Sequence, residues 1–174
     1  MRVAIITGVP GTGKTTVANA IGSRIGAQVV RVAELALKRE LVAEYDFEHK
    51  TSTVDLDKLK PALLEEIRKL AEEGKNLIIV DSVFPCVLDN ELVELVVVLR
   101  ADPNVLRERL EKRKWPLIKV RENIEAEVLE TVKTEALECF EESKLLEVKN
   151  NTKTDLERIV SLLVEVLGSK RYDE

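Results

Sequence analysis

Continuous apolar runs alternate along the chain with longer segments in which apolar residues recur every three or four positions. A continuous run is typical of a strand buried on both faces of a parallel sheet, and the longer spacing is typical of an amphipathic helix. Because parallel neighbours need helical crossovers, the pattern predicts a three-layer α/β fold, with a five-stranded parallel sheet and helices on both faces. The predicted strands are residues 3–6, 28–32, 77–81, 93–99 and 145–148.

Helical spacing fills most of the chain between these strands. Asp102-Pro103 is typical of a helix start, and Trp115-Pro116 breaks the helix that begins there. Residues 33–54 have no clear period, so a plain helical hairpin and an insertion that holds an acceptor substrate both stay open. The predicted helices are residues 15–25, 59–70, 103–114, 124–137 and 156–166.

Composition narrows the class of protein. The 174 residues fit one domain, 1–174, and 45% apolar with 34% charged residues is typical of a soluble globular protein. A net charge of −5 argues against nucleic-acid binding by charge, and the apolar runs are far shorter than the ~20 residues of a membrane span. Cys86 and Cys139 form no CxxC motif, so we expect two free thiols in a reducing cytoplasm.

The motif richest in chemistry is Gly8-Val9-Pro10-Gly11-Thr12-Gly13-Lys14-Thr15, which fits G-x-x-x-x-G-K-[ST] and is called the P-loop below. It follows the first predicted strand and opens the first predicted helix. Glycine lets the backbone curl so that successive N–H groups point at a phosphate, and the helix N-terminus adds partial positive charge. Lys14 can bridge the β- and γ-phosphates, and the Thr15 hydroxyl can ligate Mg²⁺. The sequence therefore predicts nucleotide binding.

Asp81 ends the apolar run of the third predicted strand. Carboxyl ends of parallel strands meet at one edge of a sheet, so Asp81 is expected near the P-loop. A carboxylate there is suited to hold Mg²⁺ directly or through water, although a simple turn residue would look the same. We therefore expect Thr15 and Asp81 to form the metal site.

Residues 107–121 are rich in Arg and Lys in an otherwise acidic chain. Arg109 and Arg113 lie four positions apart, so a helix places both on one face. Guanidinium groups suit the negative charge that spreads over the γ-phosphate oxygens during phosphoryl transfer. A solvated helix face, neutralised by the acids of 122–130, is the alternative. His49, the single histidine, is expected at the surface rather than in catalysis.

Thr152-Lys153-Thr154-Asp155 is similar to the [NT]KxD element with which GTPases read guanine. No D-x-x-G motif occurs in the chain, so the switch element of that class is missing. The sequence therefore does not favour a GTPase.

Several longer stretches add to the P-loop: VVVLRADPNVLRERLEKRKW at 96–115, ENIEAEVL at 122–129, EYDFEHKTSTVDLDKL at 44–59 and IIVDS at 78–82. With them, nearly the whole chain resembles the nucleoside monophosphate kinases. Within that group it is similar to the adenylate kinase isoenzyme 6 family, whose members are small P-loop enzymes.

The resemblance implies an acceptor-binding subdomain near 31–54 and a short lid at 112–122. Arg113 would be the lid arginine on ATP, Arg109 a second phosphate contact, and the loop at Asn151-Thr152 would pass the adenine. It also implies a link to small ribosomal subunit maturation, through contact with a ribosomal protein of the platform. The residues implied to hold the ATP phosphates are Gly11, Gly13, Lys14, Thr15 and Thr16.

Three positions depart from the family pattern. The family's histidine two residues after the Asp81 carboxylate is Val83 here, and its lid pattern Arg-Gly-aromatic is Arg113-Lys114-Trp115. The family's arginine for the acceptor phosphate falls on Leu37, and the cations alongside it, Lys38 and Arg39, are the candidates for acceptor binding.

The expected reaction is that of an adenylate kinase, in which ATP and AMP form two ADP with Mg²⁺. AMP, or another nucleoside monophosphate, is the expected acceptor. One alternative is an ATPase switch for ribosome assembly with little kinase activity, and another is a kinase of a different small metabolite.

Overall fold

The computed structural model describes residues 1–46 and 51–169, and the side chains of 1–42 and 53–169. His49 lies outside the described residues, so its expected surface position stays a prediction. Among the described helices, none combines the length and the apolar character needed to cross a lipid bilayer.

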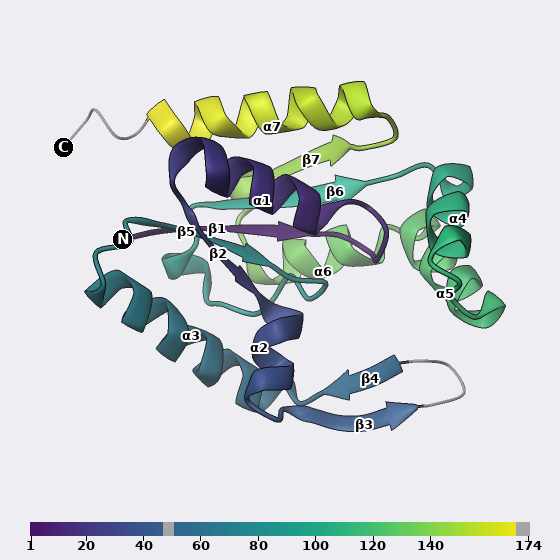
Figure 1. The fold of residues 1–174 in the computed structure, drawn as a ribbon, viewed down its shortest axis with the longest axis horizontal. Coiled ribbons are helices and arrows are strands. Elements are labelled where there is room, and N and C mark those ends of the chain that lie inside the picture. Colours follow the sequence, from purple (N-terminus) through teal and green to yellow (C-terminus); the bar gives the residue numbers. More distant parts are fainter. Residues whose placement is uncertain (47–50, 170–174) are drawn as a thin grey trace.

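A five-stranded sheet forms the centre of the molecule (Figure 1). Its strands lie in the order β2-β5-β1-β6-β7, and every neighbouring pair is parallel. The sequence prediction of a five-stranded parallel sheet is therefore confirmed. The strands are β1 (Arg2–Thr7), β2 (Gln28–Arg31), β5 (Leu77–Asp81), β6 (Leu95–Arg100) and β7 (Leu145–Lys149).

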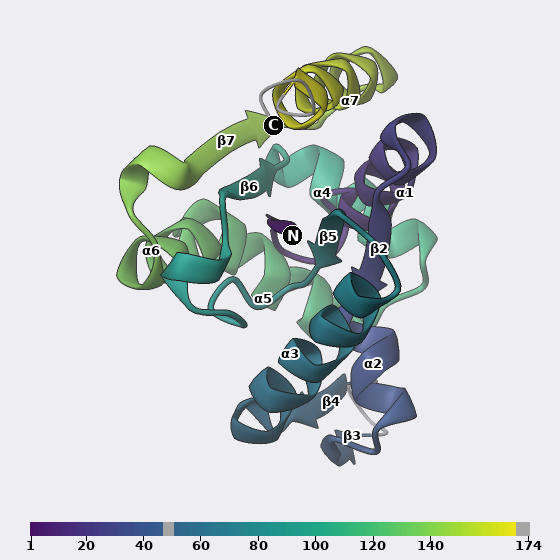
Figure 2. The ribbon, with the colours of Figure 1, turned by 90° about the vertical axis from the view of Figure 1, so that its left-hand side faces the viewer.

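Alternate residues of β1 face two different cores, as strand geometry requires. Val3 and Ile5 pack with α3 (Leu56–Glu72) and α6 (Thr131–Cys139), and Ala4 and Ile6 pack with α1 (Lys14–Ile25) and α7 (Lys153–Gly168). Figure 2 shows the sheet between these two helical layers. Both faces are thus covered, which explains why β1 and β5 are apolar at almost every position.

Two helices beyond the carboxyl ends of β1 and β6 form a third cluster (Figure 1). Leu106 and Leu110 of α4 (Pro103–Lys112) pack with Val120 of α5 (Leu117–Val128) and with Val9 of the P-loop. This packing joins the basic segment of the chain to the phosphate-binding motif.

The prediction of one helix over 124–137 is wrong. The chain leaves α5 after Val128 and begins α6 at Thr131, and Glu130 between them has φ of 54°. A left-handed residue cannot continue a right-handed helix. The apolar spacing runs on through this corner, so periodicity alone did not reveal it.

The described residues between 32 and 54 form a helix and a pair of antiparallel strands rather than a helical hairpin. The elements are α2 (Val32–Lys38), β3 (Val42–Asp46) and β4 (Thr51–Val54), with Val42 paired to Val54. Helix α2 ends at Lys38, Glu40 has φ of 54°, and the N–H of Leu41 donates to the Ala36 carbonyl. The β-branched residues that follow are typical of strands.

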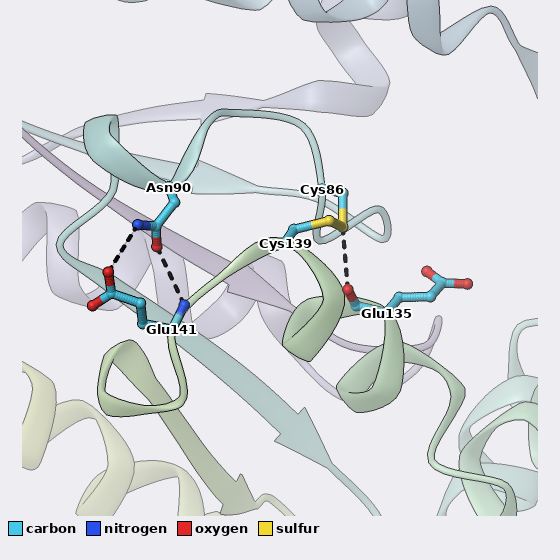
Figure 3. The surroundings of a disulfide bond; sticks show 5 residues. All are labelled: Cys86, Asn90, Glu135, Cys139 and Glu141. Atoms are coloured by element: carbon cyan, nitrogen blue, oxygen red, sulfur yellow. Dashed lines mark hydrogen bonds between the residues drawn. A yellow bond between two sulfur atoms is a disulfide. The ribbon is translucent and has the colours of Figure 1, made fainter.

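The expectation of free thiols is also wrong, because Cys86 and Cys139 form a disulfide with Cα atoms 5.8 Å apart (Figure 3). The bond ties the loop after β5 to the end of α6. Next to it, the Asn90 amide donates to the Glu141 carboxylate and accepts from the Glu141 N–H. Asn90 is the first residue of the short 3₁₀ helix η1 (Asn90–Leu92), and Glu141 directly precedes a second one, η2 (Glu142–Lys144). Sequence separation hid the pairing, since only the fold brings these segments together.

Candidate nucleotide-binding site

The P-loop leaves β1 and enters α1 through a turn that only glycine accommodates. Gly11 and Gly13 have φ of 92° and 95°, in the left-handed region. A Cβ atom at Gly13 would lie 2.5 Å from Nδ2 of Asn150, and one at Gly11 would lie 2.8 Å from Leu106. The motif glycines therefore serve both the curl of the loop and its close packing on neighbouring elements.

Side chains from outside the loop hold its carbonyl oxygens. Asn150 Nδ2 donates to the Thr12 oxygen at 2.9 Å, and Arg109 donates to the Gly11 oxygen at 3.1 Å. In a trans peptide the C=O and N–H point in opposite directions, so the bond from Asn150 turns the Gly13 N–H to the other side of the loop. Gly13 offers α1 no side-chain cap, which leaves the first N–H groups of that helix available to an anion.

Lys14 is buried at the start of α1, and its Nζ donates to the Val9 carbonyl at 3.3 Å. Burial lowers the pKa of Lys14 to about 8; Asp81 acts in the opposite direction, and Arg113 lowers it further. A buried ammonium with a lowered pKa gains stability when an anion arrives. Lys14 is thus prepared to bind phosphate oxygens.

Thr15 and Asp81 meet as the sequence suggested, with the Thr15 hydroxyl donating to Asp81 Oδ2 at 2.6 Å. Asp81 is buried at the end of β5. A hydroxyl and a carboxylate side by side are the oxygen donors that Mg²⁺ prefers beside substrate phosphates. These two residues fit the metal expected there.

A cavity of about 470 Å³ extends from the P-loop toward α2 and the β3–β4 hairpin. At the P-loop it is lined by Gly11, Gly13, Lys14, Thr15 and Thr16, which are the residues predicted to hold the phosphates. Toward the hairpin its walls are apolar, and they come from Val32, Ala33, Leu37, Val42, Val54 and Phe84. The cavity can therefore hold a polyanion at one end and an uncharged ring at the other.

The two predicted arginines have different positions. Arg113 follows the last turn of α4 and lines the cavity together with Trp115. Arg109 is one turn earlier, where its guanidinium donates to the carbonyls of Gly11, Asn150 and Asn151. Burial, and then the charge of Arg113, hold the pKa of Arg109 below its ordinary value. In this structure Arg109 connects the P-loop to the loop after β7, and its contact with a phosphate stays a prediction.

The candidates for acceptor binding lie outside the lining of this cavity. Lys38 lines a separate pocket of about 180 Å³ beside Glu66, and Arg39 donates to Glu65 on α3 at 3.3 Å. Their predicted role therefore requires a movement of α2.

Thr152 caps the start of α7. Its hydroxyl accepts from the Asp155 N–H, and the Asp155 carboxylate accepts from the Thr152 N–H, each at 3.1 Å. The TKTD sequence is thus a capping box, which explains its likeness to a guanine-reading element without any ligand.

Sequence reasoning missed Asn150 and left Arg31 without a specific role. Asn150 is buried directly after β7 and fixes the Thr12 carbonyl, but nothing in its sequence context distinguishes it from a turn residue. Arg31 ends β2 opposite Asp81 and lines the cavity. A charged residue at the end of an apolar strand is the signal that had identified Asp81, and it could have identified Arg31 as well.

Comparison with known proteins agrees with this geometry. A family model described as "AAA domain" matches residues 5–130. A Methanocaldococcus jannaschii protein named "Putative adenylate kinase" is 34% identical over 171 residues, covering 98% of this chain and 88% of that protein. "Adenylate kinase isoenzyme 6 homolog FAP7" of Saccharomyces cerevisiae is 32% identical over 163 residues, covering 92% and 79%.

Solved structures resemble the fold. Shikimate kinase from Bacteroides thetaiotaomicron has a TM-score of 0.62 at 19% identity, with 96% of this chain and 98% of that chain covered. A gluconokinase from Sinorhizobium meliloti has a TM-score of 0.52 at 16% identity, with 98% of both chains covered. At these identities the similarity shows a shared kinase fold and carries no information on the acceptor.

Proposed function

The chain belongs to the adenylate kinase isoenzyme 6 family of P-loop enzymes, which have nucleoside monophosphate kinase or ATPase activity, and from this premise we propose that it transfers the γ-phosphoryl group of ATP to AMP. The reaction breaks the bond between the γ-phosphorus and the β,γ-bridging oxygen. It forms a bond from an AMP phosphate oxygen to that phosphorus, and two ADP result. The chain is a nucleotide kinase in this scheme, with ATP as donor and AMP as acceptor.

One observation carries the proposal: the P-loop and an apolar wall formed by α2 and the β3–β4 hairpin line the same cavity. Phosphoryl transfer gains most of its rate from holding donor and acceptor in line. A cavity of about 470 Å³ that joins a polyanion site to an apolar wall supports such a pairing. It also supports the division into an acceptor-binding segment at 31–54 and a lid at 112–122.

The residues that line the cavity would have different roles in phosphoryl transfer. The P-loop N–H groups and Lys14 bind the β- and γ-phosphates, and Thr15 and Asp81 would hold Mg²⁺, which neutralises charge on the transferred group. Arg113 also lines the cavity, where its guanidinium can stabilise the negative charge of the transition state. Closure of the segment around Trp115 would exclude water, which otherwise hydrolyses ATP.

An acceptor panel tests the proposal. The protein is incubated with ATP and Mg²⁺ alone, and then with AMP, GMP, CMP or UMP, while ADP is quantified. We expect ADP formation to depend on AMP and to yield two ADP for each AMP consumed. Lys14→Ala is the matched control, and it should abolish the reaction because it removes the ammonium that binds the phosphates.

The same panel separates the other functions. ADP formation at the same rate with and without an acceptor, increased by a ribosomal protein of the small-subunit platform, would favour an ATPase switch. Val83 stands at the position where the family pattern has histidine, which is the reason for testing an ATPase switch. Activity with a hydroxylated metabolite but with none of the monophosphates would favour a metabolite kinase. Either result would contradict the adenylate kinase reaction.

A further inference from the structure

The acceptor end of the cavity needs a cation. A nucleoside monophosphate carries close to two negative charges at neutral pH, and its phosphate must approach both the triphosphate and the Asp81 carboxylate. Like charges within a few ångströms repel strongly in a partly desolvated site. Of the cavity-lining residues described, Lys14 belongs to the P-loop and Arg113 to the segment after α4, so both face the donor nucleotide. Leu37, which lines the same cavity from α2, carries no charge.

Arg31 occupies the place where this charge is needed. It is the last residue of β2, in register with Asp81 of β5, and its Nε lies 3.9 Å from Asp81 Oδ2. Asp81 in turn accepts from the Thr15 hydroxyl. The side chain of Arg31 is 40% exposed and lines the cavity, so a ligand can reach it. Its guanidinium therefore lies next to the donor phosphate site, on the side of α2.

Neighbouring acids orient this guanidinium without using all of its donors. Glu34, in the first turn of α2, accepts from one terminal nitrogen of Arg31, and Asp81 faces Nε. A guanidinium has five N–H groups in a fixed plane, so two contacts leave donors for a phosphate. The fork geometry of arginine also matches phosphate better than a lysine does.

We propose that Arg31 binds the phosphate of the acceptor and thereby makes the enzyme select a phosphorylated acceptor. The inference rests on the proposed function, since it assigns the acceptor phosphate of that same cavity. Arg39 cannot take this role in the observed arrangement, because its guanidinium is turned to Glu65 and Glu66 on α3. Arg31 supplies, from the end of β2, a cation that the α2 residues lining the cavity do not carry.

AMP and adenosine differ only in the phosphate, so comparing their binding tests the contact between Arg31 and that phosphate. Dissociation constants for AMP and for adenosine are measured by calorimetry with wild type, Arg31→Ala and Arg31→Lys. Loss of a charged hydrogen-bonding pair should weaken AMP binding by about 10- to 100-fold in Arg31→Ala, while adenosine binding changes less than about twofold. The dissociation constant of Arg31→Lys for AMP should lie between those of wild type and Arg31→Ala. Arg24→Ala, an exposed arginine at the end of α1, is the matched control and should bind both ligands as wild type does.

Steady-state kinetics distinguish phosphate binding by Arg31 from a purely structural role, because only phosphate binding should affect KM for AMP without affecting KM for ATP. Arg31→Ala should raise KM for AMP by about tenfold or more, with KM for ATP changed less than about threefold. Guanidinium ion at millimolar concentration should restore part of the lost activity in Arg31→Ala and have no such effect on wild type. Arg39→Ala tests the competing assignment, because Arg39 is the other arginine considered for the acceptor phosphate.

The outcomes separate this inference from the proposed function. If wild type uses AMP as acceptor but Arg31→Ala weakens AMP and adenosine equally, or weakens neither, the inference is overturned and the function stands. If Arg39→Ala rather than Arg31→Ala raises KM for AMP, the contact belongs to α2. If wild type binds no monophosphate at all, both proposals fall together.

Discussion

Arg109 of α4 donates a hydrogen bond of 3.1 Å to the carbonyl oxygen of Gly11, 98 positions earlier in the chain. The same guanidinium donates to the carbonyls of Asn150 and Asn151 at 2.7 and 3.2 Å. One side chain thus holds the P-loop and the loop after β7 in fixed positions. Arg109 is a positioning residue in this arrangement, because it shapes the loop that binds phosphate.

Arg109→Ala should destabilise the protein before any nucleotide is added. Three carbonyl oxygens lose a charged donor, which costs about 1–3 kcal/mol and lowers Tm by roughly 3–10 °C for a chain of this size. KM for ATP should rise, since the P-loop loses its support. Arg109→Lys should recover only part of the loss, because one ammonium cannot span all three acceptors. Differential scanning calorimetry of the ligand-free variants measures the first effect. An unchanged Tm combined with a raised KM would indicate that Arg109 acts directly on a phosphate.

The lowered pKa of Lys14 predicts that activity depends on pH. Its pKa is lowered to about 8 in the free protein, so the ammonium is lost as the pH rises through that value. The kcat/KM for ATP, which reports the free enzyme, should therefore fall above pH 8. Bound phosphate favours the ammonium, so the fall in kcat should begin at a higher pH. A kcat/KM profile that stays flat to pH 9.5 would contradict the lowered pKa.

The same shift affects folding with a definite sign. The native pKa of about 8 lies below the ordinary lysine value of 10.5, so between these values the unfolded chain binds more protons than the native state. The free energy of unfolding should then gain a contribution from Lys14 as the pH rises from 8 to 10.5. Lys14→Met keeps the bulk without the charge. Denaturant titrations across this range should show a smaller rise for Lys14→Met than for wild type.

Arg113 should act on turnover more than on binding. It lines the cavity directly after α4, and its charge acts on Lys14 of the P-loop, so its guanidinium can stabilise charge that develops during transfer. Arg113→Ala should lower kcat by about 100-fold and change KM for ATP less than about threefold. Arg107→Ala removes an exposed arginine from the same helix, outside the cavity lining, and should behave as wild type. A change confined to KM in Arg113→Ala would contradict a role in the transition state.

The donor half of the site could be predicted because its chemistry lies in one short motif. The P-loop carries its own glycines, lysine and hydroxyl, and Asp81 ends an apolar strand that had to lie at the same sheet edge. The strands could be predicted as well, since burial on both faces makes the interiors of β1 and β5 continuously apolar. Local sequence determines these features.

Features that depend on tertiary contacts could not be predicted. Glu130 is polar and unremarkable in sequence, yet its left-handed backbone divides α5 from α6. Asn150 acts on Thr12 across 138 positions, and Arg39 turns to Glu65 rather than into the cavity. The cavity wall proposed for the acceptor comes from α2, the hairpin and the end of β2, so Arg31 was proposed as its cation from the fold and not from spacing within 33–54.

The Cys86–Cys139 disulfide gives a prediction for both stability and acceptor binding. It joins residues 53 positions apart, and loop-closure entropy for that length corresponds to about 4 kcal/mol of stability, or roughly 10 °C in Tm. Phe84, two residues before Cys86, lines the cavity, so release of this loop should also raise KM for AMP several-fold while KM for ATP stays constant. The enclosed segment includes β6, α4 and α5, so the bond limits how far the lid region and the core can separate on unfolding.

Reducing agent and a double variant measure these effects together. Tm of the wild type should fall by roughly 10 °C in the presence of a strong reductant, whereas Cys86→Ala/Cys139→Ala should have the lower Tm with or without it. The double variant controls for unrelated effects of the reductant, and its folded state at moderate temperature keeps the kinetic comparison meaningful. Two thiols that react with a thiol reagent in the native, unreduced wild type would contradict the bond. If the reductant left the Tm of the wild type unchanged, the disulfide would add nothing to stability. The Asn90–Glu141 contacts would then be sufficient to hold the two segments together.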